Sequence, residues 1–330
     1  MAIDMHCHWL PPALAERLAD RTAPPRIVTD ADGSRWLVIP NERLAFGADY
    51  SDPDRRLAAM RADGVDRQVI SLPGLFGIDS LPAPEAEPLL ALYNRAAADL
   101  AAGEPDRFRA LAALPLADIE RSVAVLDDAV ARDGAAGAIL PADAFRTRHA
   151  AERIEPVLRA IARLGVYAFI HPGPLPGARP REAIAADTAD PADNAGQRHI
   201  SLAVQHRLSE VMVTLLMGGL MDDLPDLRVH VANLGGSFPF LLSRIDHVAE
   251  TRGLPRPEPA RLAGRLVVDC ASFDTAAIDL AIAALSPDAV VLGSDWPVFS
   301  ARRAMAGLGR LDAGIRQRVA EDNARRFLRA

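Results

Sequence analysis

Short apolar, β-branched runs alternate with longer segments of helical period along the 330 residues of the chain. A period of two is typical of strands and one near 3.6 of helices, so the alternation predicts strand–helix units around a parallel sheet. The predicted strands cover 2–6, 67–71, 108–113, 136–140, 166–170, 228–232, 266–269 and 289–293. The clearest helices cover 51–63, 86–103, 119–133, 152–164, 199–217 and 238–251. Eight such units in one chain predict a single domain over residues 1–330, an α/β protein of the (β/α)8 TIM barrel class.

Two segments interrupt this repeat. Residues 13–52 form an insertion after the first strand, with a short hairpin predicted around 35–39, and residues 172–194 form a loop rich in Pro, Ala, Asp and Gly. Segments that follow barrel strands lie over the C-terminal mouth, where active sites are built. We therefore expect a lid-like insertion and a loop over the active-site mouth, with a solvated loop of no function as the equal alternative for each.

Four potential metal ligands lie at predicted strand ends. His6 and His8 end the first strand, and side chains alternate along a strand, so both imidazoles project to the same side. His171 follows the fifth strand and Asp295 the eighth, which places all four side chains at one rim of the barrel. Three neutral imidazoles and a carboxylate suit one divalent ion, with Zn²⁺ the first expectation and Mn²⁺ the alternative.

The amino-acid composition excludes several kinds of catalytic site and partner. The 37 basic residues are all arginine, because the sequence contains no lysine, which excludes Schiff-base lysines, phosphate-loop lysines and a carboxylated lysine between two metals. The net charge of −7 and scattered arginines predict no nucleic acid or membrane partner. Two cysteines, with no secretory signal and no apolar span of about 18 residues, predict a cytoplasmic protein.

Several motifs, taken in order along the chain, resemble one known family. They are Asp4-Met5-His6-Cys7-His8, Ile170-His171-Pro172, Leu234-Gly235-Gly236 and Gly293-Ser294-Asp295-Trp296-Pro297. The chain resembles the amidohydrolase superfamily, in the branch that contains aminocarboxymuconate semialdehyde decarboxylase and the resorcylate and vanillate-type decarboxylases. The resemblance implies a barrel with one divalent metal held by His6, His8, His171 and Asp295. It also implies a small-molecule substrate and a homodimer.

The sequence departs from that family at one position. Where the family has a catalytic histidine before the glycine pair, this chain has Asn233. An amide can orient a substrate or water but cannot shuttle a proton, so we expect Asp295 to be the proton carrier. His230 lies three residues earlier, on the face opposite to Asn233 by strand alternation, and is expected to be structural. Asp269 is predicted either to support the site by hydrogen bonds or to cap the next turn.

Other residues are candidates for substrate binding. Trp9 and Trp296 each follow a proposed ligand and are expected to wall the pocket, with core packing as the alternative for Trp9. His199 and His206 share one face of a predicted helix near the mouth, with solvent exposure as the alternative. An anionic substrate group would be bound by arginine, and the mouth segments contain Arg43, Arg181 and Arg198.

Two enzyme functions fit these residues. The first is a mononuclear metal-dependent decarboxylase of a small aromatic or unsaturated carboxylic acid. The alternative is a metal-dependent hydrolase of a lactone, ester or amide on the same scaffold, which Asn233 favours because the usual acid or base is missing. A divergent barrel that keeps the metal without turnover is a third and weaker hypothesis.

Overall fold

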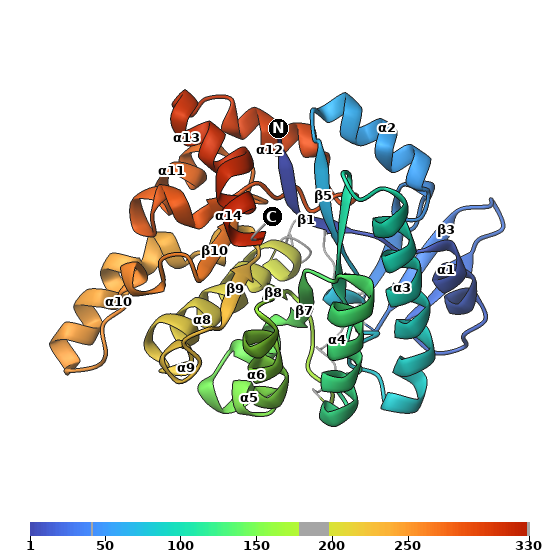
Figure 1. Ribbon diagram of the computed structural model, residues 1–330, viewed down its shortest axis with the longest axis horizontal. Coiled ribbons are helices and arrows are strands. Elements are labelled where there is room, and N and C mark those ends of the chain that lie inside the picture. The colour runs from blue at the N-terminus through green and yellow to red at the C-terminus, as the bar shows by residue number, and fades with distance from the viewer. Residues whose placement is uncertain (41, 178–197, 329–330) are drawn as a thin grey trace.

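The computed structural model describes residues 1–40, 42–177 and 198–328 (Figure 1). Eight parallel strands form the barrel in the order β1-β5-β6-β7-β8-β9-β10-β11. Their bounds are β1 (Ile3–His8), β5 (Arg67–Ser71), β6 (Phe108–Ala112), β7 (Gly137–Pro141), β8 (Tyr167–His171), β9 (Arg228–Val231), β10 (Leu266–Asp269) and β11 (Val290–Val291). The predicted (β/α)8 barrel is confirmed.

Backbone hydrogen bonds close the barrel between its first strand and the segment after its last. The Met5 N–H donates to the Leu292 carbonyl at 2.9 Å, and the His8 N–H donates to the Trp296 carbonyl at 2.7 Å. The first strand and the segment after the last strand therefore lie side by side. This closure brings His8 close to the residues around Asp295.

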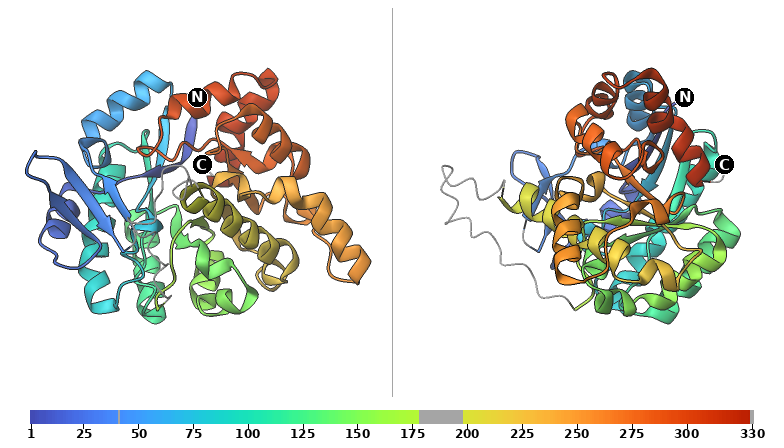
Figure 2. Two further views of the ribbon diagram at one scale, coloured as in Figure 1. Left: turned by 180° about the vertical axis from the view of Figure 1, so that it is seen from behind. Right: turned by 90° about the vertical axis from the view of Figure 1, so that its left-hand side faces the viewer.

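Helices surround the barrel on its outer side (Figure 2). The α-helices are α1 (Pro12–Ala19), α2 (Pro53–Asp63), α3 (Ala83–Gly103), α4 (Ile119–Asp133), α5 (Arg148–Glu152), α6 (Glu155–Leu164), α8 (Ala203–Met217), α9 (Leu220–Asp223), α10 (Phe238–Arg252), α11 (Thr275–Ala284), α12 (Ala301–Leu308), α13 (Ala313–Gln317) and α14 (Asn323–Leu328). The short turns are η1 (Ala48–Tyr50), η2 (Gly74–Phe76), η3 (Ala142–Phe145), η7 (Asn233–Gly235), η8 (Pro259–Leu262) and η9 (Pro287–Ala289), with π-helical turns at η6 (Arg198–Leu202) and η10 (Arg318–Asp322).

Local sequence signals account for well-predicted helix ends. The Asp118 side chain caps α4 by accepting from the Arg121 N–H, and Gly134 ends this helix in the left-handed conformation. This helix has the predicted bounds. Two other predictions need correction. The helix predicted over 152–164 starts at residue 155 as α6, because residue 152 ends the separate short helix α5. The helix predicted from residue 199 starts as the π-helical turn η6 before α8. Among the described residues, no helix combines the length and the apolar character of a bilayer span.

The insertion after β1 has its own small sheet. The strands β2 (Arg26–Thr29), β3 (Arg35–Ile39) and β4 (Glu42–Ala45) pair antiparallel, and the predicted hairpin is part of this sheet. The sheet lies at one edge of the molecule beside α1 (Figure 1). An apolar cluster separate from the barrel core includes Leu14, Leu37 and Leu90 and packs the insertion against the barrel helices. Residues 178–194 of the predicted mouth loop lie outside the described residues.

Candidate metal and substrate site

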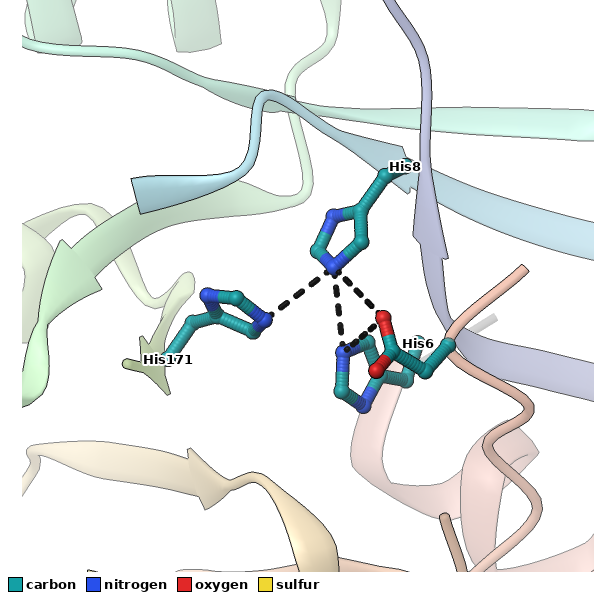
Figure 3. A group of neighbouring side chains, drawn as sticks. His6, His8 and His171 are labelled. Carbon is teal, nitrogen blue, oxygen red and sulfur yellow. Dashed lines mark hydrogen bonds and ion pairs between the residues drawn. The ribbon is translucent and has the colours of Figure 1, made fainter. Parts of the chain in front are cut away.

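Three imidazoles and a carboxylate converge at the C-terminal mouth of the barrel. His6 Nε2 lies 3.2 Å from His8 Nε2, which lies 3.1 Å from His171 Nε2. The Oδ1 atom of Asp295 lies 3.0 Å from His8 Nε2 and 3.5 Å from His6 Nε2. All four ligand atoms lie within 4.8 Å of one another, and Figure 3 shows the three rings pointing toward one centre. The structure thus brings together the four residues that the sequence singled out as ligands.

The backbone presents Asp295 to this centre in an unusual conformation. Its φ angle is +58°, in the left-handed region that Asp tolerates better than most residues. Its N–H donates to the His6 carbonyl at 2.8 Å, so the carboxylate is tied to the strand that carries two of the histidines. Burial raises the pKa of Asp295, which favours the protonated carboxyl group.

The hydrogen-bond partners determine which ring nitrogens face the centre. The Nδ1 atom of His6 lies 3.0 Å from the Asp269 carboxylate, and that of His171 lies 3.0 Å from the Pro172 carbonyl. Both partners can only accept, so both Nδ1 atoms carry a hydrogen. His8 Nδ1 lies 3.1 Å from Ser71 Oγ, whose own hydrogen is donated to a backbone carbonyl. All three histidines therefore direct Nε2 toward the common centre.

The donor set fits a divalent cation. Burial lowers the pKa of both His8 and His171 well below the ordinary value, so these two rings are neutral. Two neutral Nε2 lone pairs then face each other at 3.1 Å, an arrangement that repels unless a cation lies between them. Burial lowers the pKa of His6, but Asp269 and Asp295 outweigh this effect and raise it to about 9. Nitrogen and oxygen donors of this kind bind Zn²⁺ and Mn²⁺.

Two further buried residues lie beneath the ligands. The Asp269 carboxylate bonds to His6 Nδ1 and, at 2.9 Å, to His230 Nε2. Asp269 therefore supports the site by hydrogen bonds, and it also caps the turn that follows, because its Oδ1 atom accepts from the Ala271 N–H at 3.0 Å. The expectation that His230 faces away from the site is wrong, because the strand ends at Val231 and the alternation does not extend to Asn233, whose φ is +53°.

A cavity of about 470 Å³ opens directly above the ligands. Asn233 lines this cavity, and its buried Oδ1 atom has no hydrogen-bond partner among the described residues. The wall is largely apolar and aromatic and borders the ligand residues His8, His171 and Asp295. The other lining residues are Leu44, Tyr50, Pro73, Leu75, Phe76, Pro172, Ser201, Val204, Gln205, Ala271, Ser272, Phe273, Val298 and Phe299. This cavity matches a small, largely apolar molecule whose one anionic group lies beside the four candidate metal-binding side chains.

The described lining does not include the two tryptophans expected to wall the pocket. Trp9 packs in the core of the insertion, with Nε1 3.4 Å from the Ser51 carbonyl. Trp296 is buried against the guanidinium of Arg56, which lies 4.2 Å from the ring centroid. Each tryptophan follows a ligand along the chain, but its ring packs away from the cavity.

His206 also lies apart from the described cavity wall. His206 on α8 is 76% exposed and lies 3.7 Å from Glu210. The side chain of His199 lies outside what the structure describes. Ser201 and Gln205 line the cavity instead, because they are four residues apart and share the inward face of the helix.

None of the three arginines considered for anion binding is part of the described lining. Arg43 forms an ion pair with Asp30 and lies over the Trp36 ring, and Arg198 is exposed. Arg181 lies outside the described residues. The aromatic wall is not among the predicted site residues, although Phe76 and Phe273 each lie within a few residues of a strand end, a position that indicates the mouth of the barrel.

Comparison with known proteins agrees with this geometry. The profile of the amidohydrolase family matches residues 3–330, which is nearly the whole chain. The chain belongs to the amidohydrolase family. This amidohydrolase is 28% identical over 254 residues to the 2-amino-3-carboxymuconate-6-semialdehyde decarboxylase of Dictyostelium discoideum, an alignment that covers 74% of this chain and 67% of the relative.

Two further comparisons concern resorcylate-type enzymes. The amidohydrolase is 28% identical over 264 residues to the gamma-resorcylate decarboxylase of Polaromonas sp. JS666, covering 74% of this chain and 76% of the relative. The crystal structure of dihydroxybenzoic acid decarboxylase from Polaromonas sp. JS666, with bound manganese and the inhibitor 2-nitroresorcinol, superposes with a TM-score of 0.72. It is 20% identical, and the match covers 99% of this chain and 96% of that chain. This likeness confirms the fold.

Proposed function

We propose that this amidohydrolase is a mononuclear metal-dependent decarboxylase of a small aromatic or unsaturated carboxylic acid. The observation that carries the proposal is the convergence of three Nε2 atoms and the Asp295 carboxylate at the floor of a largely apolar cavity. The similarity to decarboxylases of aminocarboxymuconate semialdehyde and gamma-resorcylate supports this reaction over hydrolysis. A carboxylate would contact the ligand cluster while its ring or unsaturated chain contacts the aromatic wall.

His6, His8, His171 and Asp295 would hold the ion. A divalent ion bound there would supply a Lewis acid that neutralises and orients the substrate carboxylate or a neighbouring hydroxyl group. We expect Zn²⁺ from the donor set, and Mn²⁺ is the alternative because a structural relative binds manganese. The hydrogen bonds on the three Nδ1 atoms fix each ring in the orientation that this binding requires.

Asp295 is the proposed proton donor. Its Oδ1 atom lies in the ligand cluster, which leaves Oδ2 to carry and transfer a proton, and burial raises the pKa of this carboxyl group. The proton moves from this carboxyl group to the substrate carbon that bears the carboxylate. The bond between the two carbons then breaks, its electron pair returns to the ring or unsaturated chain, and carbon dioxide leaves.

Asn233 is the proposed orienting residue. Its Oδ1 atom is buried and lacks a partner within the described chain, a state that costs about 1–3 kcal/mol unless a ligand supplies the hydrogen bond. The amide faces the cavity beside the ligand residues His171 and Asp295. We propose that this oxygen accepts a hydrogen bond from a hydroxyl or amino group of the substrate and so orients the reacting carbon.

The insertion and the aromatic wall complete the substrate site. Leu44 on β4 and Tyr50 on η1 line the cavity, which supports a lid role for residues 13–52.

We propose a homodimer on the basis of family resemblance alone. The two buried, unpaired cysteines Cys7 and Cys270 support a reducing, cytoplasmic location.

Carbon dioxide release tests the proposed reaction. Protein loaded with Zn²⁺ or Mn²⁺ is mixed with hydroxybenzoates and muconate-type acids, and aryl esters and lactones serve as substrates for the alternative hydrolase. We expect one carbon dioxide for each acid consumed and no acid release from the esters. Hydrolysis of esters or lactones without carbon dioxide release from any acid would establish the hydrolase instead.

A further inference from the structure

Asp269 occupies a central position beneath the proposed metal site. It ends β10 and is fully buried, and its carboxylate accepts four hydrogen bonds. Its Oδ2 atom accepts from His6 Nδ1 at 3.0 Å and from His230 Nε2 at 2.9 Å. Its Oδ1 atom accepts from the backbone N–H groups of Asn233 at 3.1 Å and of Ala271 at 3.0 Å. One oxygen thus contacts a metal ligand and the other contacts the turn that carries the substrate-facing amide.

We propose that Asp269 is a positioning residue that couples the metal ligand His6 to the Asn233 turn. The inference rests on the proposed function, since it assigns a task to Asp269 within that same site. An ionised carboxylate only accepts hydrogen bonds, so Asp269 requires the hydrogen of His6 on Nδ1 and leaves Nε2 for the ion. A carboxylate in this position also increases the basicity of the ligand imidazole.

The Asn233 turn depends on the same carboxylate. Asn233 and Leu234 have φ angles of +53° and +57°, which cost energy for residues other than glycine. On the far side, a Cβ atom on Gly236 would lie 2.1 Å from the Gln205 carbonyl, so the turn packs directly against α8. The turn is therefore held between α8 and Asp269, and the Asn233 amide has a fixed position relative to His6.

His230 holds the carboxylate in place. Its ring stacks on Phe169, with a centroid distance of 4.3 Å and an interplanar angle of 22°. The buried Nδ1 atom has no hydrogen-bond partner among the described residues, so the ring's hydrogen bond is the one that Nε2 makes to Asp269. This geometry assigns His230 the role of orienting Asp269, one step removed from the ligands.

The substitution Asp269→Asn tests the inference. An amide has one accepting end, so its NH₂ group must face either the two ring N–H groups or the two backbone N–H groups. We expect the dissociation constant for Zn²⁺, measured by chelator competition, to rise at least about tenfold, as is typical of residues that support metal ligands. The absorption spectrum of the Co²⁺-loaded protein should change as well, because His6 is displaced.

Asp4→Asn is the matched control. Asp4 is equally buried beneath the site, but it accepts from Ser294 Oγ at 2.6 Å, from the Ser294 N–H at 3.0 Å and from the backbone N–H of His6 at 3.3 Å, and it forms no hydrogen bond with a described imidazole ring. We expect its metal affinity to stay within about threefold of wild type. Equal weakening by both substitutions would overturn the inference, because any buried carboxylate would then have the same effect.

The remaining measurements separate the outcomes. Wild-type affinity in Asp269→Asn overturns this inference alone, whereas a wild-type protein that binds neither Zn²⁺ nor Mn²⁺ contradicts the proposed function as well. If Asp269→Asn does not fold, the substitution His230→Phe tests the inference instead. We expect it to weaken metal binding by less than the tenfold expected for Asp269→Asn, and unchanged metal affinity would overturn the inference. The coupling itself predicts that Asp269→Asn and Asn233→Ala have non-additive effects on kcat/KM, and additive effects would contradict it.

Discussion

Asn233 combines two costs that an ordinary loop residue avoids. Its φ of +53° is unfavourable for most side chains, and its buried Oδ1 atom lacks a hydrogen-bond partner within the described residues. Asparagine tolerates the left-handed conformation better than most residues, which explains how the turn can form. A substrate group that donates a hydrogen bond to this amide oxygen would remove the second cost. We therefore expect Asn233 to have a role in substrate binding.

Removing the amide is expected to lower activity without unfolding the protein. We predict that Asn233→Gly lowers kcat/KM by roughly 5- to 100-fold, because a hydrogen bond worth about 1–3 kcal/mol is lost while the backbone is relieved. Asn233→Ala should lose as much activity and also about 1 kcal/mol of stability, since alanine is strained at positive φ. Steady-state kinetics and thermal unfolding measure both effects, and unchanged kinetics in both variants would refute a role for the side chain.

Restoring the family histidine gives a second test at the same position. If the amide is a substrate contact, Asn233→His impairs turnover of the native substrate, because the imidazole places its polar atoms differently. A gain in decarboxylation would instead show that the Asn233 amide has no specific role and that the family histidine has simply been lost. Comparison of kcat and KM for the two proteins on one carboxylic acid measures the difference.

Asp79 is a buried carboxyl group outside the site. Both of its oxygens are buried without hydrogen-bond partners among the described residues, and burial raises its pKa to about 7. The folded protein thus binds this proton more tightly than the unfolded chain does, so the stabilisation is complete below about pH 4 and is lost as the pH rises through 7. Between pH 6 and pH 8 we predict that the free energy of unfolding falls by roughly 1 kcal/mol more in the wild type than in Asp79→Asn. Urea unfolding at both pH values measures this, and identical losses in the two proteins would contradict it.

At the element scale, helix α2 stabilises the strand that carries two ligands. Its Arg56 is fully buried, donates to the His8 carbonyl and, at 2.8 Å, to Gln68 Oε1, and stacks over Trp296. One planar guanidinium thus joins β1, β5 and the segment that follows Asp295. Lysine could not bond both oxygens in this fork and stack at once.

We predict that Arg56→Lys and Arg56→Met both destabilise the protein, by about 3 kcal/mol, because buried oxygens lose their donor. Thermal unfolding measures the loss. The exposed Arg43→Lys is the matched control, since this side chain lies outside the described cavity wall and half in solvent. Full rescue by lysine at position 56 would show that charge alone, without the fork geometry, is sufficient.

The insertion is tested through the strand that reaches the cavity. Leu44 on β4 lines the cavity, so Leu44→Glu places a negatively charged side chain where it would repel the carboxylate of the substrate. We predict that KM rises at least about tenfold while metal affinity is unchanged, with the neighbouring Arg43→Ala as the control. An unchanged KM would contradict a lid role for this sheet.

Sequence patterns anticipate elements better than they anticipate side-chain directions. The barrel and the ligand quartet could be predicted because the four side chains lie at or just after the carboxyl ends of strands that meet at one rim. His6 and His8 are at the end of β1, His171 ends β8 and Asp295 follows β11. Trp9 and His206 could not be placed in the same way, because a shift of one residue along a strand or helix turns a side chain to another face. The Asn233 turn was equally inaccessible, because strand alternation gives no information about a left-handed backbone.

At the scale of the whole molecule, the ligands come from both ends of the chain. His6 and His8 lie on the first strand and Asp295 follows the last, so a bound ion would join segments that also close the barrel. Because the ion binds the folded state, we predict that chelation lowers the melting temperature by several degrees and that added Zn²⁺ or Mn²⁺ restores it. Thermal unfolding with and without chelator measures the shift, and equal melting temperatures would contradict a structural contribution of the ion.

The central claim is that one ion, held by these four side chains, supports decarboxylation. Titration of metal-free protein with Zn²⁺ or Mn²⁺, with carbon dioxide release from a turned-over aromatic acid measured at each step, tests it most directly. We predict that the rate of carbon dioxide release rises linearly up to one ion per chain and then stays constant, and that His8→Ala abolishes the rise. Carbon dioxide release that is independent of metal, or a plateau at two ions per chain, would contradict it.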